Sequence, residues 1–256
     1  MTSPMPAVFV GHGSPMNALP GSPFAEGWRA LGERLPRPRA ILAISAHWET
    51  DRVAVTGQDH PPTIHDFRGF PQALLDIRYP APGAPELVEA VAGLLDPVGV
   101  RADHDWGFDH GLWSVLAHMF PNADVPTAQL SLDRALDGPG HYALARKLRP
   151  LRDQGVLILG SGDIVHNLRA MRREGPQPWA ERFDARIRTA ISDGDLETVL
   201  AIDADEDARL SVPDREHYFP LLYPLAQRDP GEGVSFFNVG IDLGAISMTS
   251  FVVGQA

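Results

Sequence analysis

Short apolar runs alternate with longer amphipathic segments along the whole chain. The apolar runs are rich in Val, Ile and Leu and are bounded by Gly, Ser or Pro, which predicts buried strands. The expected strands are residues 7–10, 40–46, 53–56, 127–132, 156–159, 234–238 and 247–253. Helical periodicity predicts helices at 24–34, 84–95, 112–119, 142–153, 179–192 and 216–227. This alternation indicates an α/β layered fold with a central, largely parallel or mixed β-sheet flanked by helices.

Three of the ten histidines come just past the ends of expected strands. His12 and His47 each follow such a run, and His166 lies a few residues beyond a third. In open α/β sheets, ligands bind outside the carboxyl ends of the strands. Three imidazoles brought to one sheet edge therefore predict a metal site or an acid–base site, and the pattern alone leaves both alternatives open.

A glycine-rich turn, Gly160-Ser161-Gly162-Asp163, precedes His166. We expect this turn to begin a helix, with Asp163 as the N-cap. The turn does not form the Gly-x-Ser-x-Gly elbow of α/β hydrolases, so a serine nucleophile has little support.

Two long connections, residues 58–71 and 103–111, combine His and Asp with aromatic side chains. Long stretches without regular structure in a compact domain are often functional. Aromatic walls with a few polar anchors suit a planar organic ligand. We expect the segments 65–70 and 106–108 to supply the walls, and His65 to contact the substrate.

Composition narrows the chemistry further. The 256 residues contain no cysteine, which excludes thiol nucleophiles, Cys-ligated zinc and disulfides. Lys147 is the single lysine, and because it stands between Arg146 and Arg149 it is a poor Schiff-base candidate. The chemistry therefore falls to histidines, carboxylates, hydroxyls or a metal.

Charge and hydropathy bear on partners and location. The formal net charge of −11 argues against a nucleic-acid partner. No apolar stretch approaches the roughly 20 residues that span a bilayer, and no basic signal-peptide region is visible at the N-terminus. We expect a single catalytic domain over residues 1–256, a cytoplasmic location and no membrane partner; the oligomeric state stays open.

Six short motifs follow one another along the chain: GHGSPMNAL (11–19), SAHW (45–48), PPTIHDF (61–67), WGFDHG (106–111), VHNL (165–168) and EHY (216–218). Together they resemble the DOPA-dioxygenase type of class III extradiol ring-cleavage dioxygenases. The resemblance implies an α/β fold and a single non-haem metal. It also implies that O₂ opens the ring of a DOPA-like catechol beside its hydroxyls, to give a muconic semialdehyde.

The resemblance also implies roles for five histidines. By position, His12, His47 and His217 are similar to the metal ligands of the family. His166 is similar to the active-site histidine, which either reaches the metal or acts as the base. His110 resembles the histidine placed beside bound oxygen.

The identity of the metal is less sharply implied. More distant relatives use a carboxylate as third ligand, whereas the matching position here is His217, with Glu216 beside it. We expect one divalent metal ion per chain, Fe(II) for catalysis because zinc has no accessible redox change. Zn(II) stays the alternative bound metal, because histidines also bind zinc well.

Two other functions fit the same histidines. One is a zinc-dependent hydrolase, with Glu49 or Glu216 as base, although no His-Glu-x-x-His signature is present. The other is a non-enzymatic metal-binding or interaction protein of the Memo type, which shares this fold. Retention of His166 and His110 favours an enzyme, because a scaffold does not require them.

The chain also offers three cations that could bind a substrate carboxylate. Arg68, Arg78 and Arg169 all lie near candidate site residues, and their spacing does not choose between them.

Overall fold

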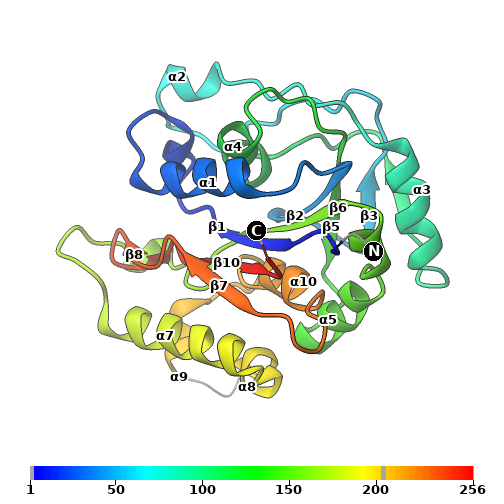
Figure 1. The fold of residues 1–256 in the computed structure, drawn as a ribbon. Helices are drawn as coiled ribbons and strands as arrows, with labels where there is room; N and C mark the ends of the chain where they lie inside the picture. Colours follow the sequence, from blue (N-terminus) through cyan, green and yellow to red (C-terminus); the bar gives the residue numbers. More distant parts are fainter. Residues whose placement is uncertain (1–2, 203–205, 256) are drawn as a thin grey trace.

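The computed structural model describes residues 3–202 and 206–255 and is organised around a mixed sheet of eight strands (Figure 1). Their spatial order is β4 (Arg101–Asp103), β3 (Ala54–Thr56), β5 (Thr127–Asp133), β2 (Ala40–Thr50), β6 (Val156–Gly162), β1 (Ala7–Gly11), β10 (Ser250–Val253) and β7 (Val234–Phe237). The four central strands β5, β2, β6 and β1 run parallel. Strand β10 is antiparallel to β1 and β7, and β3 is antiparallel to β5. The expected α/β fold with a largely parallel or mixed sheet is confirmed.

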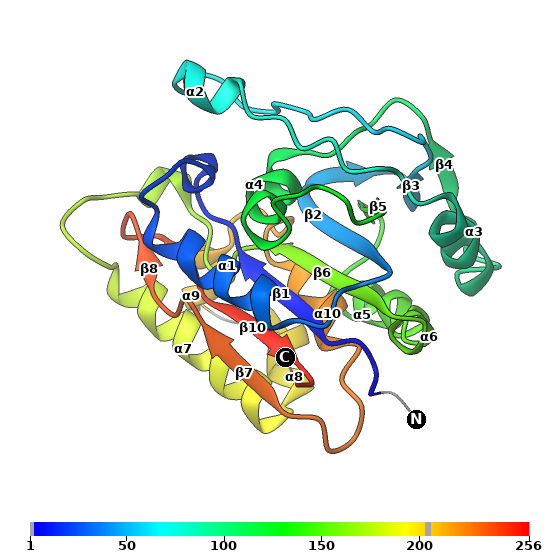
Figure 2. The same ribbon diagram turned by 45° about the horizontal axis from the view of Figure 1, so that its top comes forward.

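Helices cover both faces of the sheet (Figures 1 and 2). On one face lie α1 (Pro23–Arg34) and α4 (His110–Met119), which pack against each other. Successive side chains of a strand point to opposite faces. Val8 and Val10 of β1 accordingly join the core under these helices, whereas Phe9 joins the core on the other face.

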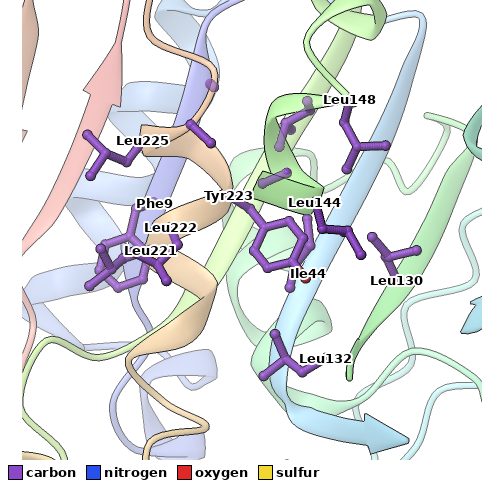
Figure 3. Packing of buried hydrophobic residues seen from close by; sticks show 14 of the residues in the cluster. Phe9, Ile44, Leu130, Leu132, Leu144, Leu148, Leu221, Leu222, Tyr223 and Leu225 are labelled. Atoms are coloured by element: carbon purple, nitrogen blue, oxygen red, sulfur yellow. The ribbon is translucent and has the colours of Figure 1, made fainter. Parts of the chain in front are cut away.

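The opposite face is covered by α5 (Gly138–Arg146) and α10 (Leu222–Leu225), among other helices. Figure 3 shows Leu144 of α5 and Leu222 of α10 in the apolar cluster that Phe9 enters from β1. Each fully buried side chain of this size contributes about 1.5–3 kcal/mol. The sheet is therefore held between two apolar layers.

The remaining elements are short connections and a helical layer on the C-terminal side. They are α2 (Gln72–Leu75), α3 (Pro85–Leu94), α6 (Pro150–Asp153), α7 (Pro178–Asp193), α8 (Leu196–Leu200), α9 (Glu206–Ser211), the two-stranded pair β8 (Ile241–Asp242) and β9 (Ile246–Ser247), and 3-10 turns at Pro15–Ala18, Leu168–Ala170 and Phe219–Leu221. Within the described part of the chain, no helix combines the length and the hydropathy needed to cross a bilayer.

Proline explains two differences from the expected helices. The helix expected at 142–153 is interrupted, and α6 starts anew at Pro150, which lacks an amide hydrogen for a continuous helix. The helix expected at 216–227 is shorter: a 3-10 turn that contains Pro220 begins at Phe219, and α10 follows it. His217 therefore precedes the helix.

Three expectations about strand ends and the segments that follow them were wrong. Strand β2 continues to Thr50, so His47 lies inside the strand, where the register shifts between Ile44 and Glu49. Asp163 does not cap a helix: the next helical turn begins at Leu168, and Asn167 is its N-cap. The long connection expected at 103–111 is also shorter, because β4 ends at Asp103 and α4 begins at His110.

Candidate metal centre

Five histidines converge on one cavity at the carboxyl end of the parallel strands. His12, His47, His110, His166 and His217 all line this cavity of about 650 Å³. The ring centroids of His12, His47 and His217 lie 4.9–5.3 Å apart in each pairing. The structure thus brings together the three histidines marked by strand ends and the two indicated by the family motifs.

His12 is fixed by the ends of two neighbouring strands. Its backbone N–H donates to the carbonyl oxygen of Gly162 at 3.1 Å. Its Nδ1 lies 3.0 Å from Oγ of Ser161, and that hydroxyl donates to the carbonyl oxygen of Gly111. Because the Ser161 proton is already committed, Nδ1 of His12 must be the donor. Its Nε2 then carries the lone pair, in the tautomer that can bind a metal.

Asp66 holds two of the other histidines. Its carboxylate accepts from Nδ1 of His110 at 2.9 Å and from the His110 backbone N–H at 3.0 Å. The same carboxylate lies 3.6 Å from Nδ1 of His47. Burial acts to raise the pKa of Asp66, but the hydrogen bonds and charge of His110 and the charge of His47 lower it to about 2. Asp66 is therefore ionised at neutral pH and directs both Nδ1 atoms toward itself.

His217 is pressed against strand β6 by close backbone contact. Its carbonyl oxygen accepts from the backbone N–H of Asp163 at 2.8 Å. A Cβ atom at Gly162 would lie only 2.2 Å from that oxygen, so only glycine fits there. Nδ1 of His217 contacts the carboxylate of Glu216 at 3.0 Å. This leaves Nε2 of His217 as the free nitrogen.

His166 stacks on His217. The two rings are nearly parallel, with an interplanar angle of 5° and centroids 3.4 Å apart. The His166 backbone N–H donates to the carbonyl oxygen of Ser211 at 2.7 Å. Burial, helped by the charge of His110, lowers the pKa of His166 to about 4. His166 is therefore neutral at physiological pH, even though the charge of Asp214 opposes this shift.

Three more buried imidazoles, those of His12, His47 and His217, are also held neutral. Burial is the main cause that lowers the pKa of His12, His47 and His217 well below the ordinary value, and the neighbouring histidines add to it. Metal binding requires unprotonated imidazole. These three rings are therefore in the unprotonated state that a metal needs.

The unpaired atoms of this cluster fit a cation. Nε2 of His12 and Nε2 of His47 lie 3.1 Å apart, although the Nδ1 atoms of both rings face acceptors on the opposite side. Within the described residues, Nε2 of His217 and Oδ2 of Asp163 are buried without a hydrogen-bond partner, and Oδ2 lies 3.8 Å from Nε2 of His12. Several bare acceptors facing one another in a buried site are unfavourable unless a cation lies among them.

Three overlapping sets of side chains could hold that cation. The sets are His12 with His47 and His110, His12 with Asp163 and His217, and His166 with Glu216 and His217. Imidazole nitrogen with carboxylate oxygen is a donor set typical of non-haem iron and of zinc. The residues present therefore fit a divalent metal. Burial raises the pKa of Asp163 well above its usual range, and a bound cation would act in the opposite sense.

The aromatic walls come from one of the two expected segments. Phe67 and Phe70 line the cavity, next to the histidines. Trp106 instead stacks on Trp48, with centroids 5.7 Å apart, and Phe108 is fully buried in the core. The second expected wall was therefore wrong, because these rings find apolar partners inside the protein.

His65 lies outside the cavity lining. Its Nε2 contacts the carbonyl oxygen of Ile77 at 3.1 Å, and its ring packs beside Phe67 and Trp113. Contact between His65 and the substrate stays a prediction, and in this geometry the closer aromatic neighbour of the cavity is Phe67.

Sequence reasoning missed the side chains that orient the histidines. Asp66 is separated from His110 by 44 positions and Ser161 from His12 by 149, so no local pattern connects them. The one available signal was position: Asp66 lies inside the motif PPTIHDF, and Ser161 lies in the glycine-rich end of β6.

The fold and the site together define a class of protein: an α/β protein with a cluster of histidines that could hold a metal ion and that lines a ligand-sized cavity. Residues 6–225 match the family described as the catalytic LigB subunit of aromatic ring-opening dioxygenase, and the chain belongs to this family. The expected extradiol ring-opening dioxygenase, an oxidoreductase, is thereby confirmed.

Named relatives agree with this assignment. The chain is 45% identical over 257 residues to a protein of Escherichia coli (strain K12) named 4,5-DOPA dioxygenase extradiol, covering 98% of this chain and 95% of that one. A protein of the same name from Beta vulgaris is 40% identical over 255 residues, covering 95% and 94%. The crystal structure of an uncharacterized protein from Escherichia coli K12 superposes with a TM-score of 0.86 at 39% identity, covering 98% of this chain and 100% of that one.

Proposed function

We propose that this protein acts as a single catalytic domain that opens the ring of a DOPA-like catechol with O₂ to give a muconic semialdehyde. The observation that carries the proposal is the approach of Nε2 of His12 to Nε2 of His47, 3.1 Å apart in the cavity lining, together with Nε2 of His217, which is buried without a hydrogen-bond partner among the described residues. The relatives named for DOPA cleavage support the choice of substrate. Both oxygen atoms of O₂ enter the product, one in its new aldehyde group and one in its new carboxylate, while the hydroxyl that remains comes from the catechol.

We propose one Fe(II) ion per chain, with His12, His47 and His217 as its ligands. Bound iron would supply the redox-active centre at which a catechol and O₂ exchange electrons, which zinc cannot supply. The three rings line the cavity from the residue after β1, from β2 and from the turn before Phe219. Elements fixed by the sheet hold such a site more accurately than loops do.

His166 is our candidate for the base. Its ring is neutral at physiological pH, because burial lowers its pKa to about 4, so it has a nitrogen that can accept a proton. Stacking on His217 at 3.4 Å fixes the plane of the ring beside a proposed ligand. His166 would thus take a proton from a catechol hydroxyl at the moment the substrate binds.

His110 is our candidate for the residue beside O₂. Asp66 accepts the Nδ1 proton of His110, which leaves Nε2 as the nitrogen available to a ligand. His110 is also the first residue of α4, where the helix dipole favours negative charge. Its role is to stabilise the negative charge that develops on oxygen and to move a proton to it.

Two phenylalanines give the cavity an apolar wall. Phe67 and Phe70 both line the cavity and offer apolar ring surface against which an aromatic ring can pack. Their own rings meet edge to face, with centroids 5.1 Å apart. A catechol held against them keeps its two hydroxyls toward the histidines.

The decisive experiment loads the protein anaerobically with Fe(II) and then adds DOPA and O₂. We expect stoichiometric O₂ uptake and a yellow ring-opened product, and no uptake by protein loaded with Zn(II). If the Fe(II) form consumes no O₂ with any catechol, the proposal fails. A product that forms equally well without O₂ would instead indicate a hydrolase.

A further inference from the structure

One cation lines the cavity, and we propose that it is a binding site for a carboxylate on the ring substituent of the substrate. The cation is Arg169, the single Lys or Arg among the described residues that line the cavity. The inference rests on the proposed function, because it concerns which catechols enter the same cavity. It assigns the specificity for an anionic substituent to one side chain.

The guanidinium of Arg169 is uncommitted. Across residues 3–202 and 206–255, neither a hydrogen bond nor an ion pair of this guanidinium is found. Its neighbour Arg172, in contrast, donates to the carbonyl oxygens of Gly175 and Pro176. Asp214 and Glu216 line the same cavity without pairing with Arg169. A positive charge is therefore available to a ligand there.

The backbone that carries Arg169 is fixed close to the catalytic histidines. The side chain of Asn167 accepts from the backbone N–H groups of Arg169 and Ala170, at 3.1 and 3.2 Å. The backbone N–H of Asn167 itself donates to the carbonyl oxygen of Ala245. Arg169 thus follows His166 by three residues on a turn that is held at both sides, and the position of its Cα is set by the site.

Exposed apolar side chains line the same cavity as Arg169. Leu168, Met171 and Leu243 all line the cavity, yet they are 56%, 44% and 38% exposed. Exposed large apolar side chains gathered at one place mark a binding surface. A ligand that covers them removes water around the guanidinium, which strengthens its attraction for an anion.

The structure also chooses among the three arginines that the sequence left open. The guanidinium of Arg78 already donates to the carbonyl oxygens of Leu75 and Ile77, at 2.6 and 2.8 Å. Arg68 is exposed and does not line the cavity. Only Arg169 combines a free guanidinium with a place in the cavity wall, and its planar fork matches the two oxygens of a carboxylate.

The test compares two catechols that differ in one charge. One is 3-(3,4-dihydroxyphenyl)propanoate, which carries a carboxylate, and the other is uncharged 4-methylcatechol. We expect Arg169→Met to raise KM for the carboxylated catechol roughly tenfold, the size typical of a charge-assisted hydrogen bond, and to leave 4-methylcatechol within about twofold. Arg169→Lys keeps the positive charge but loses the planar guanidinium. Its KM for the carboxylated catechol should therefore lie between that of the unaltered protein and that of Arg169→Met.

Arg173→Met is the matched control. Arg173 is exposed, lies four residues further along the same connection and does not line the cavity. We expect the KM of this variant for each catechol to equal that of the unaltered protein. Equal losses on both catechols in Arg169→Met, or the same selective loss in Arg173→Met, would overturn the proposal.

A binding measurement separates this inference from the proposed function. Calorimetric titration of the Fe(II)-loaded protein without O₂ compares the affinity for the two catechols, and needs no turnover. If the protein opens neither ring, the proposed function fails. The site at Arg169 still stands if the carboxylated catechol binds more tightly and Arg169→Met removes the difference, and it falls if the two affinities are equal.

Discussion

Oγ of Ser161 lies 3.0 Å from Nδ1 of His12 and decides which nitrogen of that ring faces the cavity. The serine can only accept, because its own proton goes to the carbonyl oxygen of Gly111. One hydroxyl thereby links the end of β6, the first turn of α4 and the first histidine of the chain. The tautomer of His12 is therefore determined by contacts between distant parts of the fold.

We expect Ser161→Ala to weaken metal binding 10–100-fold, the usual cost of losing a residue that orients a metal ligand. The measure is competition with a chelator of known affinity. Ser114→Ala is the control. Ser114 lies on α4 and is buried like Ser161, but its hydroxyl has no hydrogen-bond partner among the described residues. Unchanged affinity in Ser161→Ala would show that His12 keeps its tautomer without the serine.

Asp66→Asn should lower kcat by about ten- to a hundredfold with little change in KM. The asparagine side chain keeps the shape of Asp66 but removes the negative charge of its carboxylate, which lies 2.9 Å from Nδ1 of His110. Steady-state kinetics on DOPA with added Fe(II) measures kcat and KM separately. Asp59→Asn, an exposed carboxylate of the same connection, should behave as the unaltered protein. A rise in KM without loss of kcat would assign Asp66 to substrate binding instead.

Removal of a proposed ligand should empty the metal centre. We expect His12→Ala, His47→Ala and His217→Ala each to lose nearly all metal, measured by elemental analysis after anaerobic Fe(II) loading and desalting. His60→Ala removes an exposed histidine and should retain a full complement. Full metal content in the His12 and His47 variants together would refute the ligand assignment.

His166→Ala separates a base from a ligand. If His166 only accepts a proton, the variant keeps its metal and loses catechol turnover by about 10²–10⁴-fold, the range of a general base. If it ligates, metal is lost along with activity. Metal analysis and O₂ uptake on the same sample distinguish the two results.

A histidine away from the cavity should make folding sensitive to acid. Burial lowers the pKa of His141 to about 4, against the opposing charges of Asp133 and Asp137, and Nδ1 lies 3.0 Å from the hydroxyl of Tyr223. Between pH 6.5 and 4 the unfolded chain binds this proton and the folded chain does not. The free energy of unfolding therefore falls as the pH falls, by up to about 2.5 kcal/mol at pH 4.5 from this residue.

Urea unfolding at pH 7.5 and pH 4.5 tests this effect. His141→Gln keeps a polar partner for Tyr223 without a titrating group, so its free energy of unfolding should change less between the two pH values. The other buried histidines titrate in both proteins and cancel in the comparison. An equal pH dependence in the two proteins would mean that His141 is already charged when folded.

The central strands could be predicted because their burial on both faces makes them continuous apolar runs. Strand β4 could not, since two of its three residues are exposed and nothing apolar marks it. Likewise, the periodic pattern over 142–153 does not show where Pro150 breaks the helix, although the proline itself is visible.

Only some residues of the site could be predicted from the sequence. Strand ends marked His12 and His166, because a polar residue after an apolar run is a local signal. His110 and His217 have no such mark and were found only through family motifs. Asp66 and Ser161 act through contacts between distant segments, which a single sequence does not reveal.

Strand β1 lies between β6 and β10, so it has no partner in the sheet until residues from Val156 onward exist. A nascent chain that ends earlier already contains His12, His47 and His110 but lacks the serine and the backbone that hold His12. The orientation of His12 is therefore set only after β6 has been synthesised. A chain interrupted before β6 carries three of the five cavity histidines, but His12 then lacks its hydrogen-bond partners Ser161 and Gly162.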